Sequence, residues 1–421
     1  MKNNNKVLKI VYVNTFDNIG GAARVMMDLK KCLENKCLIK VLVGYKMSDD
    51  KNINTVNQTI IVKNNKLYKI LQKIIYKIRY LRSFLFSNDI DCFSNDSLIN
   101  HPWIKEADIV HFHNIHGNYI NIESLNIISK SKPIILTIHD LWSMTAHCGT
   151  CEKCKNWNKG KHFTPGLFHY QGMLFDNKEY LWNKKKNIFN RSVKCFVLPS
   201  RWIQNKYYKS YLSKCNNIVI NNGVQIVAKK YTSKSIARRN LNLPNRKTLL
   251  FIANGGRNNP SKGGDIVTKL SLKEKYKNVN FLIIGEKESK RINNMVILPY
   301  LDHKKLSEYY MASDIFLFPS LAENFPLVTL EAMSYGLPIV SFGVGGIPEQ
   351  VVHKVNGYIS KYKDIQDLTN GIDYYLRMSK KDLEHVGNIN IRKVKKYYSN
   401  KKMANEYYKL YMKTKNAKTH I

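Results

Sequence analysis

The sequence predicts an α/β protein built from two doubly wound domains, each with a largely parallel sheet. Short apolar runs rich in Val and Ile alternate with segments of helical periodicity along nearly the whole chain, an order typical of strands joined by crossover helices. The 421 residues are too many for one ordinary core, and they suit two domains of roughly 200 residues each. The apolar runs also form two series, which a polar, turn-rich stretch separates.

The first series predicts the sheet of an N-terminal domain over residues 1–200. Its strand candidates carry Val and Ile densely, as strands buried on both faces of a sheet do. In chain order they are "KVLKIVYVN", "CLIKVLVGY", "ADIVHFH", "KPIILTIHD" and "KCFVLPS".

The second series predicts a C-terminal domain of the same class over residues 216–395. Its strand candidates are "NNIVINNGV", "TLLFIANGG", "NVNFLIIGE", "NMVILPY", "DIFLFPS" and "PIVSFG". A linker is expected between Pro199 and about Lys247, where "INNGVQIVAKKYTSKS" is polar and rich in turn-forming residues. Residues 396–421 predict a basic helix with a frayed tail.

The net charge of +37 is the strongest signal in the composition. Such a surface attracts polyanions, which include nucleic acid, anionic lipid and phosphorylated ligands. A general abundance of Lys, Asn and Ile is the alternative explanation. The sequence contains no aromatic-and-basic motif for nucleic-acid recognition. It also has no apolar run of about 18–20 residues and no signal peptide, so we expect a cytoplasmic protein.

The segment from Lys66 to Phe86, "KLYKILQKIIYKIRYLRSFLF", predicts an amphipathic helix. Its apolar residues follow the helical period: Leu67, Ile70, Leu71, Ile74, Ile75, Ile78, Leu81 and Leu85. Its basic residues include Lys66, Lys69, Lys73, Lys77 and Arg82, and it has no acid. Such a helix can lie in the headgroup region of an anionic membrane. Alternatively, it is a surface helix whose apolar face packs on the domain core.

Two features of the first half suggest ligand contacts at strand ends. Gly20 and Gly21 lie between the first strand and a helix expected to begin near Ala22. There they let a phosphate approach the backbone and the helix N-terminus, or they serve a simple turn. His139 ends another strand and can hydrogen-bond a substrate, or it is structural. A third strand end has three histidines nearby, His111, His113 and His116. For these we favour cleft lining or packing over metal binding.

The run "TAHCGTCEKCKNW" has cysteines at a spacing that can reach a zinc ion. Cys148, Cys151 and Cys154 form a CxxCxxC pattern, with His147 beside it and His162 eight residues beyond. A complete two-pair zinc signature is missing. The segment is therefore either a structural metal site or redox-labile loop, or a group of unliganded thiols. Neither interpretation makes it the catalytic centre.

In the second half, "TLLFIANGGRNNPSKGGDIV" predicts a strand, a glycine-rich loop and a helix. Arg257 and Lys262 lie in the loop, just before Gly263 and Gly264. Two cations beside the amides of a helix N-terminus suit a diphosphate, whose departure needs its charge neutralised. Two solvated surface cations are the alternative in so basic a chain.

The stretch "LAENFPLVTLEAMSYG" places Glu323 in a loop and Glu331 on the helix that follows. A carboxylate can accept hydrogen bonds from the two adjacent hydroxyls of a ribose. The helix N-terminus near Phe325, Pro326 and Leu327 offers amides to a sugar or a phosphate. The later run "GVGGIPE" supplies another flexible loop at the same sheet edge.

Taken together, these motifs resemble the family 4 (group 1) glycosyltransferases of GT-B fold. The resemblance rests on Gly20–Gly21, "TIHD", "GGRNNPSKGG", "SDIFLFPSLAENFPLVTLEAMSYGLPIV" and "GGIPE". The segment around "HDLW" is also similar to bacterial exopolysaccharide enzymes of the colanic-acid type. The resemblance implies two Rossmann-like domains that face each other across a cleft, with the donor bound by the C-terminal domain and the acceptor by the N-terminal one. It also implies that the last helix packs back on the first domain.

The resemblance also implies roles for individual residues. Arg257 and Lys262 would hold the donor diphosphate, Glu331 the ribose, and Glu323 the sugar or the reacting region. His139 would lie at the transferring sugar and Gly20–Gly21 at the phosphates, while Asn324, Phe325, Pro326 and Leu327 would help to bind the donor. In this sequence "NFP" replaces the commoner Gly-Phe-Gly, which leaves the preferred donor sugar open.

The function expected from the sequence is therefore a retaining, metal-independent hexosyltransferase of cell-surface polysaccharide biosynthesis. Its co-substrate would be a UDP- or GDP-sugar, with no other cofactor. A glycan or lipid-linked acceptor at the inner face of the cytoplasmic membrane would fit the basic surface and the helix from Lys66 to Phe86. The alternatives are a GT-B-fold epimerase or phosphorylase, or a basic nucleic-acid-binding protein.

Overall fold

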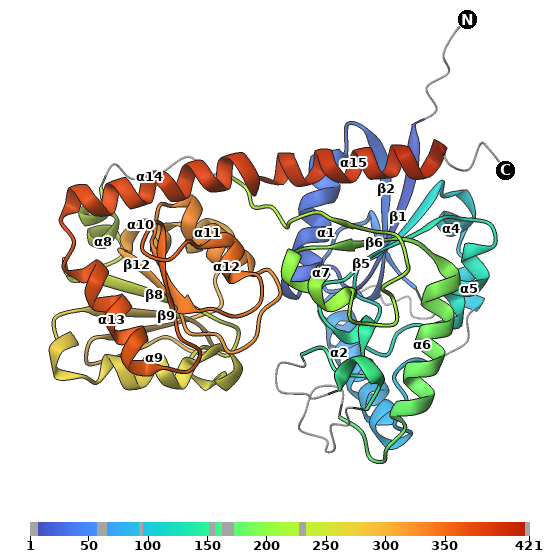
Figure 1. The fold of residues 1–421 in the computed structure, drawn as a ribbon, viewed down its shortest axis with the longest axis horizontal. Helices are drawn as coiled ribbons and strands as arrows, with labels where there is room; N and C mark the ends of the chain where they lie inside the picture. The colour runs from blue at the N-terminus through green and yellow to red at the C-terminus, as the bar shows by residue number, and fades with distance from the viewer. Residues whose placement is uncertain are drawn as a thin grey trace, which may run out of the picture. The chain divides into compact units, whose positions relative to one another are not determined.

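The computed structural model describes residues 7–56, 65–91, 96–150, 156–161, 172–226 and 233–416. The chain divides into two compact units (Figure 1). The N-terminal unit comprises Met1–Asn221 together with Met403–Ile421, and the C-terminal unit comprises Asn222–Lys402. Within the described residues, each unit contains one sheet of seven strands with helices around it. The predicted fold class, two doubly wound α/β domains, is confirmed.

The sheet of the N-terminal unit has the strand order β3-β2-β1-β4-β5-β6-β7, and every neighbouring pair is parallel. The chain winds outward from β1 in both directions, so the β1–β4 junction is a topological switch point, where ligands commonly bind. The strands are β1 (Leu8–Phe16), β2 (Cys37–Tyr45), β3 (Ile53–Thr55), β4 (Ile109–Phe112), β5 (Ile134–Thr137), β6 (Val193–Leu198) and β7 (Asn217–Val219).

Along the chain, helices separate the strands of this unit. They are α1 (Gly20–Leu33), α2 (Asn65–Leu85), α3 (Asp96–Ile99), α4 (Pro102–Glu106), α5 (Glu123–Ser129), α6 (Lys178–Ser192) and α7 (Arg201–Tyr207), with short 3-10 turns η1 (Trp142–Met144) and η2 (Trp157–Lys159). Helix α1 begins at Gly20, two residues before the start expected at Ala22. Gly20 itself has φ +86°, a left-handed conformation that glycine adopts readily, so it forms the turn that leads into the helix.

One strand was assigned to the wrong sheet from the sequence. The run "NNIVINNGV" was placed in the second series, but its strand β7 pairs in parallel with β6 of the first sheet. Phe196 lies opposite Asn217 and Leu198 opposite Val219. Strand β7 has only three residues and lies at the sheet edge, so the apolar pattern gave it too weak a signal to indicate its partner.

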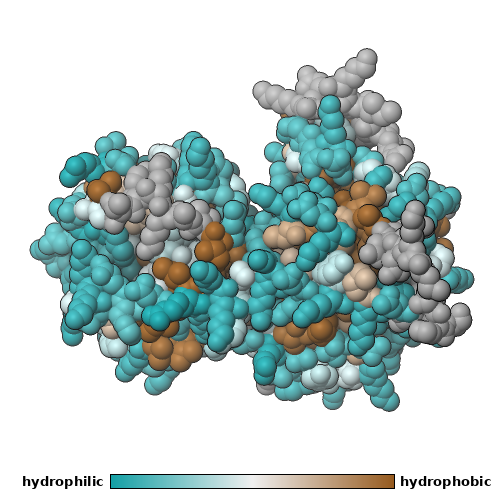
Figure 2. Space-filling model, turned by 90° about the horizontal axis from the view of Figure 1, so that it is seen from above, coloured by the Kyte–Doolittle hydropathy of each residue, from teal (hydrophilic) through white to brown (hydrophobic). Residues whose placement is uncertain are grey.

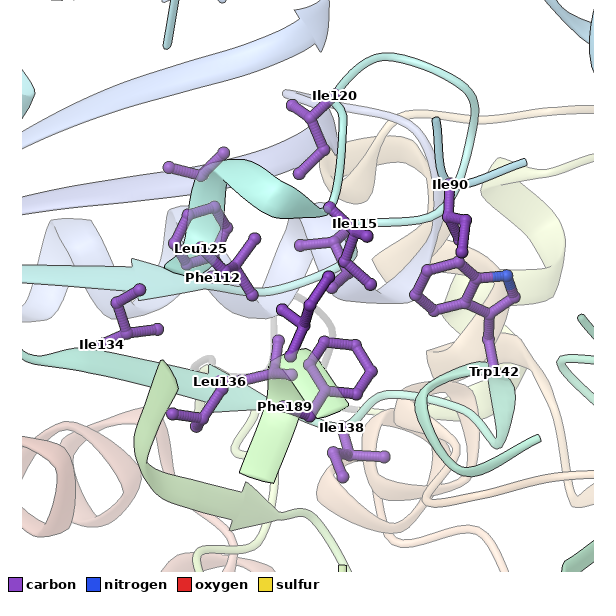
Figure 3. Close-up of a cluster of buried hydrophobic side chains, with 14 of the residues drawn as sticks. Ile90, Phe112, Ile115, Ile120, Leu125, Ile134, Leu136, Ile138, Trp142 and Phe189 are labelled. Atoms are coloured by element: carbon purple, nitrogen blue, oxygen red, sulfur yellow. The ribbon is translucent and has the colours of Figure 1, made fainter. Parts of the chain in front are cut away.

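The hydrophobic core of the N-terminal unit uses alternate residues of neighbouring strands. Phe112 of β4 and Leu136 of β5 point to one face of the sheet, where Leu125 of α5 and Phe189 of α6 meet them (Figure 3). All four side chains are fully buried. Because successive side chains of a strand point to opposite faces, the residues between them serve the other side of the sheet.

On that other face, the helix α15 (Asn400–Asn416) packs through tyrosines. Tyr411 Oη lies 2.7 Å from His111 Nδ1 and donates to Tyr12 Oη at 3.1 Å. Tyr407 Oη lies 2.9 Å from Thr137 Oγ1, which lies 2.8 Å from His111 Nε2. These buried hydroxyls satisfy both ring nitrogens of His111, so its role here is packing and not metal binding.

The sheet of the C-terminal unit has the order β10-β11-β9-β8-β12-β13-β14, with only β10 antiparallel among its strands. Its switch point lies between β8 and β12. The strands are β8 (Thr248–Ile252), β9 (Asn280–Glu286), β10 (Lys290–Ile292), β11 (Met295–Pro299), β12 (Ile315–Phe318), β13 (Ile339–Phe342) and β14 (Gly357–Ser360).

Helices cover the strands of this unit as well. They are α8 (Lys234–Asn240), α9 (Gly264–Ser271), α10 (His303–Ala312), α11 (Leu327–Ser334), α12 (Ile347–Gln350), α13 (Ile365–Leu376) and α14 (Lys380–Tyr397), with 3-10 turns η3 (Gly256–Asn258), η4 (Pro260–Lys262) and η5 (Glu274–Tyr276). The face drawn in Figure 2 is largely hydrophilic, with apolar residues in separate patches. No helix within the described ranges is both long and apolar enough to cross a membrane.

The tyrosine contacts of α15 make a stability prediction. Tyr411→Phe keeps the ring but leaves His111 Nδ1 and Tyr12 Oη without this hydroxyl in a fully buried site. We expect the free energy of unfolding to be about 1–3 kcal/mol lower than in the wild type. Urea unfolding followed by tryptophan fluorescence reports on this unit, because the five tryptophans all lie between Trp103 and Trp202.

Tyr408→Phe, one residue after Tyr407 on the same helix and partly exposed, is the matched control. It should change the unfolding free energy by no more than about 0.5 kcal/mol. Equal effects of the two substitutions would show that the buried hydroxyl of Tyr411 contributes nothing specific.

Candidate functional site

The loops that follow β8, β9 and β12 meet at the carboxyl edge of the C-terminal sheet, where ligands bind in open α/β folds. The loop after β8 runs through η3 and η4 before α9 begins. Leu321 N donates to Ser261 O at 2.9 Å, which ties this loop to the one after β12. Arg257, Lys262 and Glu323 thus lie in two directly connected loops.

Arg257 is held by a carboxylate that the sequence analysis did not single out. Its Nε donates to Glu286 Oε1 at 2.7 Å, and its Nη2 donates to Glu286 Oε2 at 3.3 Å. Burial by itself would raise the pKa of Glu286, but the hydrogen bonds from Arg257 lower it below its usual value. The arginine is therefore oriented by a bidentate pair, the geometry that its planar guanidinium favours.

Lys262 has its own carboxylate. Its Nζ donates to Glu323 Oε1 at 2.5 Å, and Ser320 Oγ donates to the same oxygen at 2.7 Å. The Glu323 side chain is 10% exposed and the Lys262 side chain 32% exposed. Arg257 and Lys262 are thus both ion-paired and partly buried, which favours a binding site over two solvated surface cations.

Glycines let these loops approach each other. Gly263 has φ +73°, and a Cβ built on it would lie 2.2 Å from Pro319 O. Gly345, in the predicted "GVGGIPE" loop, has φ +58°, and its Cβ would lie 1.8 Å from Glu323 O. Any side chain would collide with backbone at both positions, so only glycine preserves the loop contacts on either side of Glu323.

The segment before α11 contributes mainly backbone to this edge. Phe325 is buried, and its ring packs edge-on against Tyr398 at 5.5 Å between centroids. Asn324 O accepts from Gly346 N at 2.6 Å. Pro326 has no N–H, so it cannot donate to a ligand. The amides of Phe325 and Leu327 remain as candidate donors at the start of a helix that no described side chain caps.

Glu331 lies on α11 and is 6% exposed. Tyr310 Oη donates to its Oε2 at 2.9 Å, and the Tyr310 ring stacks on Tyr335 with an interplanar angle of 7°. This tyrosine fixes the carboxylate within the fold, and the sequence analysis did not single it out. Glu331 therefore differs from Glu323 in its partner, which is a tyrosine hydroxyl and not a lysine.

At the carboxyl edge of the N-terminal sheet, Gly20 and Gly21 are exposed. A Cβ built on either glycine would find no atom of the described residues within 4 Å. No described side chain caps this end of α1. The start of α1 is therefore accessible to a ligand.

His139 follows β5 at the same edge and lies against a second histidine. Its Nε2 is 3.0 Å from His113 Nδ1, and the two rings stack with an interplanar angle of 20°. Burial lowers the pKa of His139 to about 4 and lowers the pKa of His113 well below its usual value. Both rings are therefore neutral near pH 7, which makes His139 a hydrogen-bonding group there and not a cation.

The neighbouring Asp140 anchors the loop after β5. His116 Nε2 lies 2.7 Å from Asp140 Oδ2, and Trp142 N donates to Asp140 Oδ1 at 2.9 Å. Burial alone would raise the pKa of Asp140, but His116 and this backbone hydrogen bond lower it. The backbone that follows His139 is thus fixed from both sides of Asp140.

The cysteine segment is only partly described. Thr145 Oγ1 donates to Cys148 O at 2.7 Å, and His147 is buried. Cys151, Cys154 and His162 lie outside the described residues. Among the residues that are described, no group of three His, Cys, Asp or Glu side chains could hold a metal ion. The weak metal hypothesis for this segment stays a prediction.

Residues 233–393 match the family model described as Glycosyl transferases group 1. This stretch contains the Arg257–Glu286 and Lys262–Glu323 pairs and Glu331. Over this stretch, which is less than half of the chain, the sequence is similar to the group 1 glycosyl transferases. It is 23% identical over 336 residues to WcaC of Escherichia coli, named as a colanic acid biosynthesis glycosyl transferase; the match covers 76% of this chain and 80% of that protein.

Solved structures show the same fold. A sucrose-phosphate synthase from Thermosynechococcus elongatus is 15% identical and covers 97% of this chain and 100% of its own, with a TM-score of 0.66. HepE of Anabaena, solved with UDP and glucose, is 16% identical and covers 96% of this chain and 99% of its own, with a TM-score of 0.63. The chain therefore has a GT-B fold, as the resemblance implied.

The buried histidines predict a pH dependence of stability. His111, His113 and His139 have lowered pKa values when folded, so below about pH 6.5 the unfolded chain binds protons that the folded chain does not. The free energy of unfolding should therefore fall as pH drops from about 6.5 towards 4, by up to about 1.4 kcal/mol per pH unit for each histidine.

Tryptophan-monitored urea unfolding over this pH range measures the slope. His113→Gln removes one of the three groups and should reduce the slope, whereas His385→Gln, at an exposed site in the C-terminal unit, should leave it unchanged. A wild-type stability that is flat between about pH 6.5 and 4 would contradict the account.

Proposed function

We propose that this glycosyltransferase moves a hexose from a UDP- or GDP-sugar to a glycan or lipid-linked acceptor in cell-surface polysaccharide biosynthesis, with retention of anomeric configuration and without a metal ion. The observation that carries the proposal is the pair of carboxylate-anchored cations, Arg257 and Lys262, in joined loops at the carboxyl edge of the C-terminal sheet. WcaC is named for the synthesis of a polysaccharide, and HepE was solved with UDP and glucose.

The paired cations still have hydrogen-bond donors for a diphosphate. Lysine carries three N–H donors and arginine five. The contacts to Glu323 and Glu286 involve Lys262 Nζ and the Nε and Nη2 atoms of Arg257, which leaves Arg257 Nη1 for phosphate oxygens. The carboxylates hold both cations in position before the donor arrives, and such preorganisation is what electrostatic catalysis requires.

The remaining donor contacts are proposed from the other residues that the resemblance identifies. Glu331 would accept hydrogen bonds from the ribose hydroxyls, and Glu323 would contact the sugar or the reacting region. The amides of Phe325 and Leu327 would donate to the donor, while Asn324 and Pro326 would shape the segment through their backbone. Gly20 and Gly21 would let the phosphates approach the start of α1, where free helix amides favour anions.

In the proposed reaction, the bond between the anomeric carbon and the diphosphate oxygen breaks first. Arg257 and Lys262 stabilise the charge on the departing nucleoside diphosphate, and a positively charged, oxocarbenium-like sugar remains. The acceptor hydroxyl attacks from the face that the diphosphate left, and its proton passes to a leaving phosphate oxygen. Neutral His139 accepts or donates a hydrogen bond that orients the sugar, and no step requires it to be charged.

The acceptor side is proposed for the N-terminal unit. The excess of basic residues and the cationic helix α2 fit a lipid-linked acceptor at an anionic membrane, with the enzyme peripheral at its cytoplasmic face. Two kinds of rival function remain: enzymes that would bind a nucleotide sugar at the same residues, and a protein that would use only the basic charge. An epimerase or phosphorylase would change the donor without an acceptor glycan, and a nucleic-acid-binding protein would bind duplexes without binding nucleotide sugars.

Replacing the cations tests the donor site. Arg257→Ala and Lys262→Ala should each lower kcat by about 10²–10³-fold, because each removes a preorganised charge that acts on the leaving group. The measurement is release of the nucleoside diphosphate on transfer to an acceptor extract. Lys269→Ala, an exposed lysine on α9, is the control and should retain wild-type turnover. Near-normal transfer by both site variants would refute the assignment.

A double-mutant cycle tests whether Glu286 acts through Arg257. Glu286→Gln should weaken donor binding less than Arg257→Ala does, because it frees the guanidinium without removing it. If Glu286 only positions Arg257, the double variant should bind the donor no worse than Arg257→Ala alone, since residues in direct contact are not additive. Calorimetric titration of the donor supplies the affinities, and fully additive losses would show that Glu286 has an independent role.

A further inference from the structure

Helix α2 presents its apolar stripe away from the unit that carries it. Six residues, spaced three or four apart, lie within about 80° of one another on the helix circumference; they are Leu67, Ile70, Ile74, Ile78, Leu81 and Leu85. Each is exposed by 47–62%. The interpretation that this stripe packs on the core is therefore wrong.

The face of α2 that packs on the unit is aromatic and polar. Tyr76 meets Tyr45 edge-on at 5.1 Å between centroids, and Arg79 lies over the Tyr45 ring at 5.5 Å. Gln72 and Ser83 are buried on the same side. The helix is thus attached through one face and carries its apolar stripe on the opposite face, which reverses the usual arrangement of a surface helix.

A second segment adds exposed apolar residues beside the end of α2. Leu174 N donates to Phe84 O at 3.2 Å, and Phe175 N donates to Ser87 Oγ at 2.9 Å, which fixes this pair beside the end of α2. Leu174 is 56% exposed, Phe175 51% and Phe86 64%. Together with the six residues of the stripe, Phe86, Leu174 and Phe175 make up the set of exposed apolar residues that we call the α2 face.

Cations accompany the α2 face. Lys73, Lys77 and Arg82 are exposed on α2, and the chain has no acidic residue from Asn65 to Phe86. By helical geometry Lys77 and Arg82 flank the apolar stripe on opposite sides. Apolar residues between basic flanks match the boundary between the acyl chains and the anionic headgroups of a bilayer.

We propose that the α2 face binds the surface of an anionic bilayer, with α2 lying in the plane of the interface. A second copy of the chain fits less well, because dimerisation through this face would bring two sets of lysines together without acids to pair them. Nucleic acid would satisfy the cations but leave the apolar residues without a partner. Membrane binding by the α2 face does not depend on the proposed function. Only its consequence, access of the enzyme to a lipid-linked acceptor, rests on that function.

The test is flotation of the purified full-length protein with vesicles. Equal parts of phosphatidylglycerol and phosphatidylcholine supply an anionic bilayer, and phosphatidylcholine alone supplies a neutral one. Wild-type protein should float with the anionic vesicles and bind the neutral ones more weakly. Ile74→Glu with Ile78→Glu should lower the affinity for anionic vesicles at least about tenfold, through lost burial and added repulsion. Lys73→Gln with Lys77→Gln should lower it about fivefold for each charge removed.

Matched controls distinguish an effect specific to the α2 face from a general effect of charge or hydropathy. Ile127→Glu replaces an exposed isoleucine on α5, and Lys31→Gln with Lys130→Gln removes two exposed lysines from the same unit. Each should leave the binding of anionic vesicles unchanged. All variants should bind UDP- or GDP-sugars as the wild type does, so failure of donor binding in the wild type would refute the proposed function without touching this inference.

Three outcomes would overturn the membrane assignment. The first is wild-type protein that does not float with anionic vesicles, and the second is α2-face variants that float as well as the wild type. The third is a dimer, detected by sedimentation, that Ile74→Glu with Ile78→Glu dissociates, since this result would assign the α2 face to a second copy of the chain.

Discussion

The candidate site depends on one constraint: each of the two cations at the carboxyl edge of the C-terminal sheet is paired with its own carboxylate. In a chain with a net charge of +37, Arg257 and Lys262 would otherwise repel each other and sample many conformations. Glu286 and Glu323 hold them at fixed points of the loop after β8, and Gly263 lets this loop lie against Pro319 of the loop after β12. Partly exposed ion pairs add little stability, about 0–1 kcal/mol each, so their value lies in positioning.

In the N-terminal unit, by contrast, His113 and His139 lie at strand ends and are neutral near pH 7. His111 is bound on both ring nitrogens by hydroxyls, one of them from α15, and so serves packing. His113 and His139 form a stacked pair whose low pKa keeps them uncharged. A cation beside an oxocarbenium-like sugar would raise the barrier to transfer by repulsion, so a neutral imidazole is the better group near such a centre.

The sequence predicted the two sheets and the cations, because buried strands carry dense Val and Ile and loops carry Gly. It did not predict the ion partners, since Glu286 lies 29 residues from Arg257 and Glu323 lies 61 residues from Lys262. The three-residue strand β7 was too short to indicate its sheet. Periodicity likewise predicted α2 but not its orientation, which depends on aromatic contacts with Tyr45 that no local pattern contains.

Hydrogen–deuterium exchange of the wild-type protein, with and without saturating UDP- and GDP-sugars and with chelator present, tests the central claim most directly. The account predicts that one class of nucleotide sugar slows exchange in residues 253–264 and 319–327, the two joined loops that carry both cations and Glu323. Unchanged exchange in both loops with every nucleotide sugar, or protection confined to other parts of the chain, would contradict it.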